Sequence, residues 1–315
     1  MTEAIAEFAP TPRQRRSATP APIDAWHRAL LLALLALALG GFLAWRQTPL
    51  PTALDQRDFA EQFASLDRQV ELARRAGSDP LRIVFIGTSR IRNAALDPVE
   101  IAASARSAGI QRPVASTTIG VNWGGFERFA PAETMIAWRN PDVVVIMPEL
   151  LEEDFTALTR LRIGKSWAEQ AFWGKDFVLF AEKESQLQVC MGFDQSPEER
   201  QAENSRTVTA ALDGPGPRAA RAFVRRMAAA GTRVIIADLP VTAPLQALRP
   251  PLPAEAEYPA RVGLGGVPGV SAAFIVKPLA SDAYCDVAHL DPKKASVWQT
   301  AFFRHAGDRL QFPAR

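Results

Sequence analysis

The chain has 315 residues, of which 48% are hydrophobic and 22% are charged. This composition is typical of globular proteins and excludes a mainly disordered chain. The formal net charge of +2 at pH 7 gives no electrostatic reason to expect a nucleic-acid partner. Three histidines and two cysteines are too scattered along the sequence to predict a zinc site.

The two cysteines, Cys190 and Cys285, lie far apart in the sequence and do not form a CxxC pair. In an oxidising compartment they are able to form one disulfide. The alternative is two unpaired, partly buried thiols, because the sequence does not place their Cα atoms within bonding range. Both readings stay open at this point.

The N-terminal 45 residues predict a tail and a membrane anchor. Residues 1–28 are rich in proline, alanine, threonine and arginine, which is typical of a disordered tail. Residues 29–45 then run for seventeen positions without a charge, and Trp26 and Trp45 flank them. A stretch of this length is at the short end of what crosses a bilayer, and tryptophans favour membrane interfaces.

Charge asymmetry sets the expected orientation of this segment. Basic residues gather on its N-terminal side, at Arg13, Arg15, Arg16 and Arg28. The positive-inside rule therefore places the N-terminus in the cytoplasm and the bulk of the chain in the periplasm or outside the cell, anchored to the inner membrane. A cleaved signal peptide and a buried helix of a soluble core are the alternatives.

The rest of the chain alternates helical and strand-like segments. After a proline-containing stalk and an amphipathic helix, which together span residues 46–78, a single domain is expected over residues 79–315. Strands are predicted at residues 81–87, 114–119, 142–147, 233–238 and 272–276, and helices at 58–76, 98–108, 126–138, 218–230 and 295–310. This alternation predicts an α/β three-layer sandwich with a mostly parallel central sheet.

Two stretches fit this alternation poorly. Residues 156–205 contain several aromatic residues at partly helical spacing, which predicts either an inserted helical segment that borders the site or ordinary core helices. Residues 240–268 hold seven prolines and predict a long surface loop.

Ligands of parallel α/β sheets bind at the carboxyl ends of the strands, which selects four loops. The first holds Ser89, two residues after a buried strand, and the last holds Asp286 and His289. A hydroxyl needs a neighbouring base to become a nucleophile, and a carboxylate three residues before a histidine is able to orient that base. His27 lies at the membrane segment and His305 within the last helix, so His289 is the candidate base.

Each of these features has an ordinary explanation when taken alone. A serine after a strand is most often a turn or helix-cap residue, and a single histidine is usually structural. The combination of the three residues and their positions in the chain is what predicts a catalytic triad.

A strand followed by Gly-x-Ser, alternating α/β units and Asp-x-x-His just before the last helix resemble the SGNH (GDSL-like) hydrolase superfamily over roughly residues 81–310. The resemblance implies Ser89 as nucleophile, His289 as general base and Asp286 as its orienting acid. It also implies an oxyanion hole formed by the backbone N–H of Ser89 and by the loop after the second strand, with Gly120 or Gly124 and the side chain of Asn122 as donors.

The sequence departs from this family at two blocks. The first block reads Gly-Thr-Ser where the family has Gly-Asp-Ser, and Glu149 follows the third strand where the family places an oxyanion-binding asparagine. Similar departures occur in membrane-anchored SGNH-like proteins such as alginate O-acetylation proteins and the D-alanine transfer protein of lipoteichoic acid. Arg90 and Glu149 are expected to contact substrate, and for Arg90 a solvated or salt-bridged side chain is the alternative.

The sequence thus predicts an SGNH-type serine esterase or O-acyltransferase that needs no metal or organic cofactor. The expected substrate is an acylated carbohydrate or other ester of a cell-envelope or exopolysaccharide, and a membrane acyl-donor protein is an expected partner by analogy. Two rival functions remain: a catalytically inactive SGNH-like scaffold in envelope polysaccharide assembly, and a flavodoxin-like module that binds an anion at the helix N-terminus after Gly87.

Overall fold

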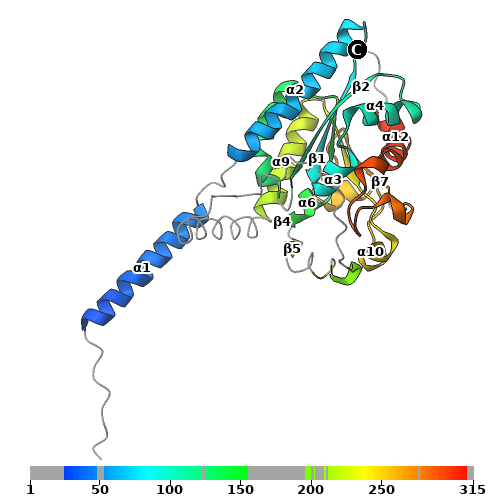
Figure 1. Cartoon of the computed structure of the whole chain (residues 1–315). Helices are drawn as coiled ribbons and strands as arrows, with labels where there is room; N and C mark the ends of the chain where they lie inside the picture. The colour runs from blue at the N-terminus through cyan, green and yellow to red at the C-terminus, as the bar shows by residue number, and fades with distance from the viewer. Residues whose placement is uncertain are drawn as a thin grey trace, which may run out of the picture. The chain divides into compact units, whose positions relative to one another are not determined.

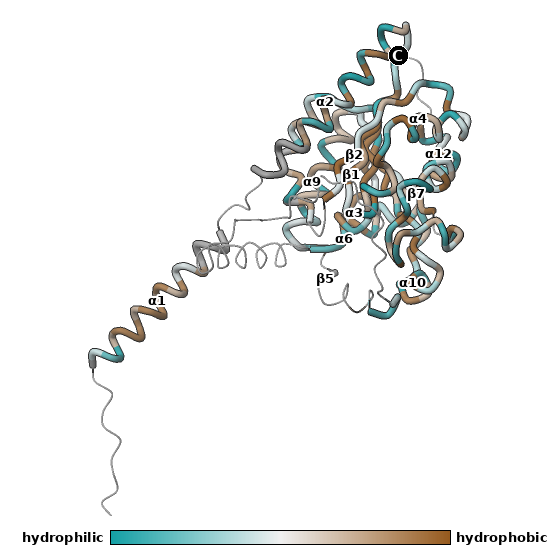
Figure 2. Tube along the Cα trace, viewed as in Figure 1, coloured by the Kyte–Doolittle hydropathy of each residue, from teal (hydrophilic) through white to brown (hydrophobic). Residues whose placement is uncertain are grey.

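The computed structural model describes residues 25–47, 53–121, 125–154, 196–199, 202, 209–210, 212–275 and 277–310. The chain divides into two compact units, Met1–Pro49 and Leu50–Arg315. In the first unit, α1 (Ala25–Gln47) includes the uncharged segment, and the residues of α1 whose burial is described are exposed. Most of α1 is hydrophobic, as the brown tube in Figure 2 shows. Within the described residues, no helix combines the length and the apolar character that a bilayer crossing requires.

The second unit is built on a sheet of five parallel strands in the order β2-β1-β3-β6-β7 (Figure 1). The strands are β1 (Leu81–Thr88), β2 (Val114–Val121), β3 (Val143–Ile146), β6 (Arg233–Asp238) and β7 (Val270–Phe274). The predicted α/β class with a parallel sheet is therefore confirmed. The strand order reverses between β1 and β3, as in flavodoxin-like sheets, and such a reversal opens a crevice at the carboxyl ends of the strands.

Alternate side chains of each strand enter two separate cores, because successive residues of a strand point to opposite faces. Val84 and Ile86 pack on one face with α2 (Ala53–Arg75), α5 (Ala130–Arg139) and α9 (Pro215–Ala229). Ile83 and Phe85 pack on the other face with α3 (Ser89–Ala94), α4 (Pro98–Ser107) and α12 (Ser296–Leu310). Helices thus cover both faces, which explains why the strands read as continuous apolar runs.

Helix α2 protects the sheet at its β2 edge. Phe59 and Phe63 of α2 are buried in the core. The carboxamide of Gln69 makes two hydrogen bonds to Ser116, because Nε2 donates to the carbonyl oxygen and Oε1 accepts from the backbone N–H, each at 3.0 Å. The side chain of Gln69 therefore takes the place that a neighbouring strand would have at this residue.

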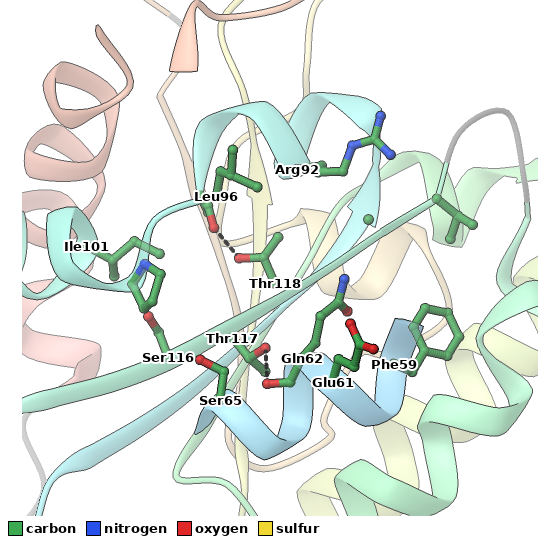
Figure 3. Close-up of a pocket in the computed structure, with 14 residues that line it drawn as sticks. Phe59, Glu61, Gln62, Ser65, Arg92, Leu96, Ile101, Ser116, Thr117 and Thr118 are labelled. Atoms are coloured by element: carbon green, nitrogen blue, oxygen red, sulfur yellow. Dashed lines mark hydrogen bonds between the residues drawn. The ribbon is translucent and has the colours of Figure 1, made fainter. Parts of the chain in front are cut away.

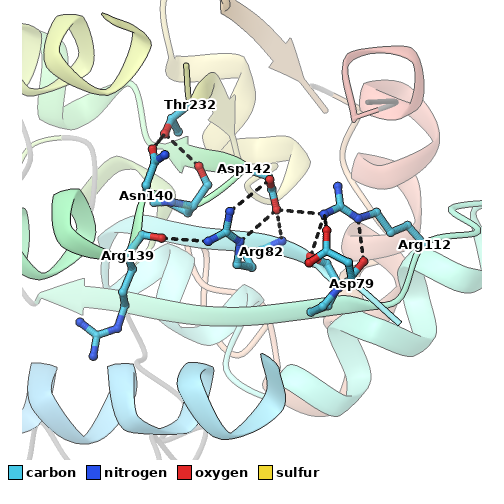
Figure 4. A network of polar contacts seen from close by, with 9 residues as sticks. Asp79, Arg82, Arg112, Arg139, Asn140, Asp142 and Thr232 are labelled. Carbon is cyan, nitrogen blue, oxygen red and sulfur yellow. Dashed lines mark hydrogen bonds and ion pairs between the residues drawn. The ribbon is translucent and has the colours of Figure 1, made fainter. Parts of the chain in front are cut away.

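A network of polar contacts fastens the amino ends of β1 and β3 (Figure 4). Asp142, which is buried, accepts hydrogen bonds from the backbone N–H of Arg82 at 2.9 Å and from its guanidinium Nε at 3.3 Å. Arg82 also donates to the carbonyl oxygen of Arg139 at 2.9 Å, and Arg112 pairs with Asp79 at 2.6 Å. This network lies at the end of the strands opposite to the one where ligands are expected.

The predicted long loop over residues 240–268 is wrong in part, because it contains the short helices α10 (Ala243–Leu248) and α11 (Tyr258–Arg261). Proline stands in the first turn of each, where it has no hydrogen-bonding N–H to lose. The predicted insertion at residues 156–205 lies almost wholly outside the described residues. The other elements of the described residues are η1 (Phe126–Phe129), α6 (Glu149–Glu152), the antiparallel pair β4 (Glu153–Asp154) and β5 (Thr209–Ala210), η3 (Ser281–Ala283) and η4 (Pro292–Lys294).

Candidate active site

Ser89 is the first residue of α3 and directly follows the last residue of β1. The side chain of Thr88, at the N-cap position, makes no capping hydrogen bond to the helix. Thr88 Oγ1 instead contacts Met147 Sδ at 3.8 Å. The first backbone N–H groups of a helix have no partner within the helix itself. The N–H groups that begin α3, including that of Ser89, thus have no capping side chain.

Two glycines let α3 approach the sheet closely enough to bring Ser89 to the strand ends. Gly87 of β1 and Gly120 of β2 are paired in register. Within α3, a Cβ at residue 87 would lie 2.8 Å from Cγ2 of Ile91, and one at residue 120 would lie 2.6 Å from Cβ of Arg92. Gly120 therefore packs directly against α3, and this close contact leaves no room for a side chain at residue 120.

The structure brings Ser89 and His289 together, although 200 residues separate them in the sequence. Ser89 Oγ lies 2.8 Å from His289 Nε2. On the other side of the ring, His289 Nδ1 lies 2.8 Å from Asp286 Oδ2 and 3.0 Å from Oδ1. An ionised carboxylate accepts hydrogen bonds, so it holds the proton on Nδ1 and leaves Nε2 as the acceptor that faces the serine.

The carboxylate of Asp286 is fixed by the backbone of its own loop. The N–H groups of Ala288 and His289 donate to Asp286 Oδ1 at 2.7 and 2.8 Å. Burial acts to raise the pKa of Asp286, but the hydrogen bonds and charge of His289 and the two backbone donors outweigh it and hold the pKa at about 2. Asp286 is therefore ionised at neutral pH, as an orienting carboxylate has to be.

Arg90 and Glu149, the two residues expected to contact substrate, bind each other. The Arg90 side chain is 10% exposed. Its Nη1 donates to Glu149 Oε1, and its Nη2 donates to the carbonyl oxygen of Leu239. Nη1 also lies 3.3 Å from Asp238 Oδ1. Burial acts to lower the pKa of Arg90, but the charges of Glu149 and Asp238 outweigh it and raise the pKa. This arrangement corresponds to the salt-bridged alternative for Arg90.

The charges of this ion pair also act on a second carboxyl group, that of Glu153. Burial, followed by the charge of Glu149, raises the pKa of Glu153 to about 8, against the opposing effect of Arg90 and Arg249. Glu153 therefore keeps a proton at neutral pH. Glu153 could not be singled out from residue type alone, because its perturbation depends on which charges the fold brings around it.

The oxyanion-hole residues predicted after β2 are described in part. Gly120 belongs to β2, whereas Asn122 and Gly124 lie outside the described residues. Their contribution therefore stays a prediction.

A pocket of about 270 Å³ lies beside β2, between α2 and the link from α3 to α4 (Figure 3). Its wall is held by Thr117 Oγ1, which donates to the carbonyl oxygen of Gln62 at 3.1 Å, and by Thr118 Oγ1, which donates to that of Ala95. The residues that line it include Arg92 and Gly120 but none of the three residues Ser89, Asp286 and His289. The pocket is thus separate from the Ser89–His289 contact.

Cys285, the residue before Asp286, is disulfide-bonded. Its backbone N–H donates to the carbonyl oxygen of His289 at 2.8 Å, which closes the loop that carries both residues. The other cysteine of the chain, Cys190, lies outside the described residues. Of the two readings of the cysteines, the disulfide is the one that agrees with the structure.

Sequence reasoning missed the segment after β6, which contacts both parts of the site. Asp238 ends β6 and is buried beside Arg90, and Leu239 provides a carbonyl acceptor. An aspartate at the carboxyl end of a buried strand was a usable signal for Asp238. The acceptor at Leu239 is a main-chain carbonyl oxygen, which every residue type has, so the sequence alone could not identify it.

No model of a known protein family and no curated protein matches the chain. Among solved structures, the chain is similar to an active-site mutant of a family two carbohydrate esterase from Clostridium thermocellum in complex with cellohexaose. The match has 12% sequence identity and a TM-score of 0.32, and it covers 71% of this chain and 63% of the esterase chain. The chain thus spans less than two thirds of that esterase, and a likeness at this level does not assign the chain to a family.

Proposed function

We propose that the chain is a serine esterase or acyltransferase in which Ser89 is the nucleophile, His289 the general base and Asp286 the residue that orients the base. The observation that carries the proposal is the pair of 2.8 Å contacts, from Ser89 Oγ to His289 Nε2 and from His289 Nδ1 to Asp286 Oδ2. This is the separation at which a base takes a proton from a hydroxyl. A flavodoxin-like anion-binding module gives no reason for this contact.

In the first step, Ser89 Oγ attacks the carbonyl carbon of the ester while its proton passes to His289 Nε2. The tetrahedral intermediate collapses, the bond to the alcohol oxygen breaks, and His289 returns the proton to that oxygen. Water or a sugar hydroxyl then attacks the acyl-Ser89 ester, with His289 again acting as base, and Ser89 is regenerated. The first product is the alcohol. The second is the acid when water attacks, or a new ester when a sugar hydroxyl attacks.

The negative charge of the intermediate needs donors near Ser89. In the proposal, the backbone N–H of Ser89 at the start of α3 is one donor. The second comes from Gly120, near the end of β2, or from Asn122 or Gly124 after it. Glu149 stands where a donor is expected, and a free carboxylate there would repel the oxyanion. Its pairing with Arg90 offsets that charge, which makes Glu149 compatible with the proposed chemistry.

The proposed substrate is an acyl ester of a carbohydrate, such as an envelope polysaccharide or exopolysaccharide. This part rests on the resemblance to SGNH proteins, as does the proposed transfer of the acyl group from a membrane donor protein. Comparing acetyl release from an acetylated polysaccharide with transfer to an added sugar acceptor separates an esterase from a transferase.

The proposal includes attachment to the inner membrane through residues 29–45, with the site on the periplasmic or extracellular side. It rests on the uncharged sequence and on the exposed apolar side chains of α1, such as Leu31 and Leu37. In membrane fractions, the full chain should stay in the pellet after alkaline carbonate extraction. The double variant L31R/L37R should move to the supernatant, and extraction of the unaltered chain would contradict the anchor.

The catalytic assignment is tested by labelling with a fluorophosphonate and by hydrolysis of a small acetyl ester. The unaltered chain should form one adduct on Ser89 and release acetate, whereas S89A should do neither and H289A should lose hydrolysis. S107A, which alters an exposed serine at the end of α4, is the control and should behave like the unaltered chain. Absence of an adduct on the unaltered, folded chain would favour the inactive scaffold.

A further inference from the structure

Arg90 connects the helix that starts with Ser89 to the ends of two other strands. It is the second residue of α3, so its backbone adjoins the serine. Its guanidinium reaches Glu149, which follows β3, and both Asp238 and the carbonyl oxygen of Leu239 at the end of β6. One buried side chain therefore ties the carboxyl ends of β1, β3 and β6 together.

The segment that follows β6 also holds the loop of His289. The backbone N–H and Oγ1 of Thr242 both donate to the carbonyl oxygen of Val287, at 3.1 and 3.0 Å. Tyr284 Oη donates to the carbonyl oxygen of Val241 at 3.0 Å. Residues 239–242 thus bind Arg90 on one side and the loop that carries Asp286 and His289 on the other.

This segment is itself held at its start. Asp238 Oδ1 accepts a hydrogen bond from the backbone N–H of Leu239 at 2.8 Å, and Asp238 Oδ2 lies 3.4 Å from Arg249 Nη1. Asp238 is buried, so solvent screens these contacts less than it would at the surface. Residues 239–242 are therefore held in place, and they position both Arg90 and the loop that carries His289.

We propose that Arg90 is a positioning residue, which sets the distance between Ser89 Oγ and His289 Nε2 by tying α3 to residues 238–242. The inference rests on the proposed function and departs from the expectation that Arg90 contacts substrate. Arginine suits this role because its planar fork binds several acceptors in fixed directions, whereas the lysine ammonium is a point charge on a flexible stem. Loss of the fork is expected to let α3 shift while the site stays folded.

A second link joins α3 to the histidine loop directly. Asn93 Nδ2 donates to the carbonyl oxygen of Leu290 at 3.4 Å. This contact is at the long end of hydrogen-bond distances and involves no charged group. It is the alternative candidate for setting the distance between Ser89 and His289, and the kcat of N93A measures its contribution.

The test compares R90K with the unaltered chain in ester hydrolysis and in the rate of fluorophosphonate labelling. Positioning predicts that kcat and the labelling rate fall roughly 10- to 100-fold while KM stays within about twofold, since a 1 Å misplacement is able to cost this much. A residue that binds substrate instead predicts a higher KM and unchanged labelling by the small, neutral phosphonate. That second outcome, or unchanged kcat, would overturn the inference.

R82K is the matched control, because Arg82 is also partly buried and bound to a carboxylate and a carbonyl oxygen, but at the amino end of β1. It should keep kcat and the labelling rate of the unaltered chain. If R90K does not fold, R90M/E149Q removes both charges of the pair and should show the same loss of kcat. Full activity of this double variant would equally overturn the inference.

Failure of the proposed function is recognised separately, since the unaltered chain would then show no Ser89 adduct and no hydrolysis. The position of the serine is read in that case from the ¹⁵N NMR signal of His289 Nε2, which responds to the hydrogen bond from Ser89. The signal should change in R90K and stay constant in R82K. A signal that is the same in R90K and the unaltered chain would show that Arg90 does not set the contact.

Discussion

Ser89 Oγ lies 2.8 Å from His289 Nε2, although the two residues are 200 positions apart in the sequence. Ser89 follows the carboxyl end of β1, and His289 lies in the segment that precedes α12. Neither side chain is held by its own element alone. Ser89 depends on the packing of α3 against two glycines, and His289 depends on a loop fixed by Asp286 and by Thr242. The contact is therefore sensitive to changes at residues that never touch a substrate.

Asp286→Asn should lower kcat for ester hydrolysis by roughly 10³- to 10⁴-fold while the chain stays folded. The asparagine amide no longer enforces a proton on His289 Nδ1, so the ring loses the tautomer that accepts the serine proton. Initial rates at saturating acetyl ester measure the effect, with circular dichroism as the control for folding. A loss of less than about tenfold would contradict the role assigned to Asp286.

The same residue predicts a dependence of stability on acid. The pKa of Asp286 is about 2 in the folded chain and about 3.9 in an unfolded one, so the unfolded state binds more protons between these values. Its stabilising effect, on the order of 2 kcal/mol, is complete above about pH 4 and is lost as the pH falls toward 2. Urea unfolding should show the gap between the unaltered chain and D286N closing over this range, and a constant gap would refute the prediction.

Glu153 predicts the opposite trend at higher pH. Its pKa is about 8 in the folded chain and about 4.3 when unfolded, so the folded state holds a proton that the unfolded state releases. Stability should therefore fall as the pH rises from about 4.3 to 8. E153Q keeps the neutral shape and should remove this fall, as measured by denaturant unfolding at pH 5 and pH 8. Equal pH dependence in both chains would contradict the prediction.

Gly120→Ala should destabilise the fold by about 1 to 3 kcal/mol and lower activity, because the new Cβ would lie 2.6 Å from Arg92 Cβ and 3.2 Å from Thr88 O. The backbone of α3 has to move to relieve this contact, and Ser89 moves with it. G307A is the matched control, since a Cβ at that position in α12 meets nothing within 4 Å. It should raise stability by roughly 0.5 to 1 kcal/mol and leave kcat unchanged.

Cys285→Ser should lower both stability and kcat, because the disulfide of Cys285 holds the loop that carries Asp286 and His289. A native disulfide typically contributes about 2 to 4 kcal/mol. Treatment with a thiol reductant should reproduce the loss in the unaltered chain and leave C285S unaffected. A reduced chain with full kcat would show that the disulfide does not contribute to the site.

The sheet could be predicted from the sequence because strands buried on both faces are runs of apolar residues. The segments around Val84, Val144 and Ile235 each formed a strand close to the predicted bounds. The helices α10 and α11 could not be predicted in the same way, since the prolines that read as breakers stand at helix starts. Whether a proline ends a helix or begins one depends on the conformation of the residues that follow it.

The proximity of Ser89, His289 and Asp286 could be predicted because strand ends of a parallel sheet gather at one edge. The partner of Arg90 could not, because a salt bridge needs the relative position of loops that the sequence leaves open. Glu149 begins α6, just after β3, and Asp238 ends β6, so their charges act on Arg90 only after β3 and β6 are aligned. The same holds for the main-chain acceptor at Leu239.

The two hydrogen bonds between the carboxamide of Gln69 and Ser116 occupy main-chain groups of β2 that an added strand would otherwise bind. A shortened chain that begins after Arg75 would expose the apolar surface that Phe59 and Phe63 cover. It would also leave the edge strand β2 free to pair with a second copy of the chain. A shortened chain for expression should therefore begin before Ala53, because a later start is expected to let β2 pair with a second copy.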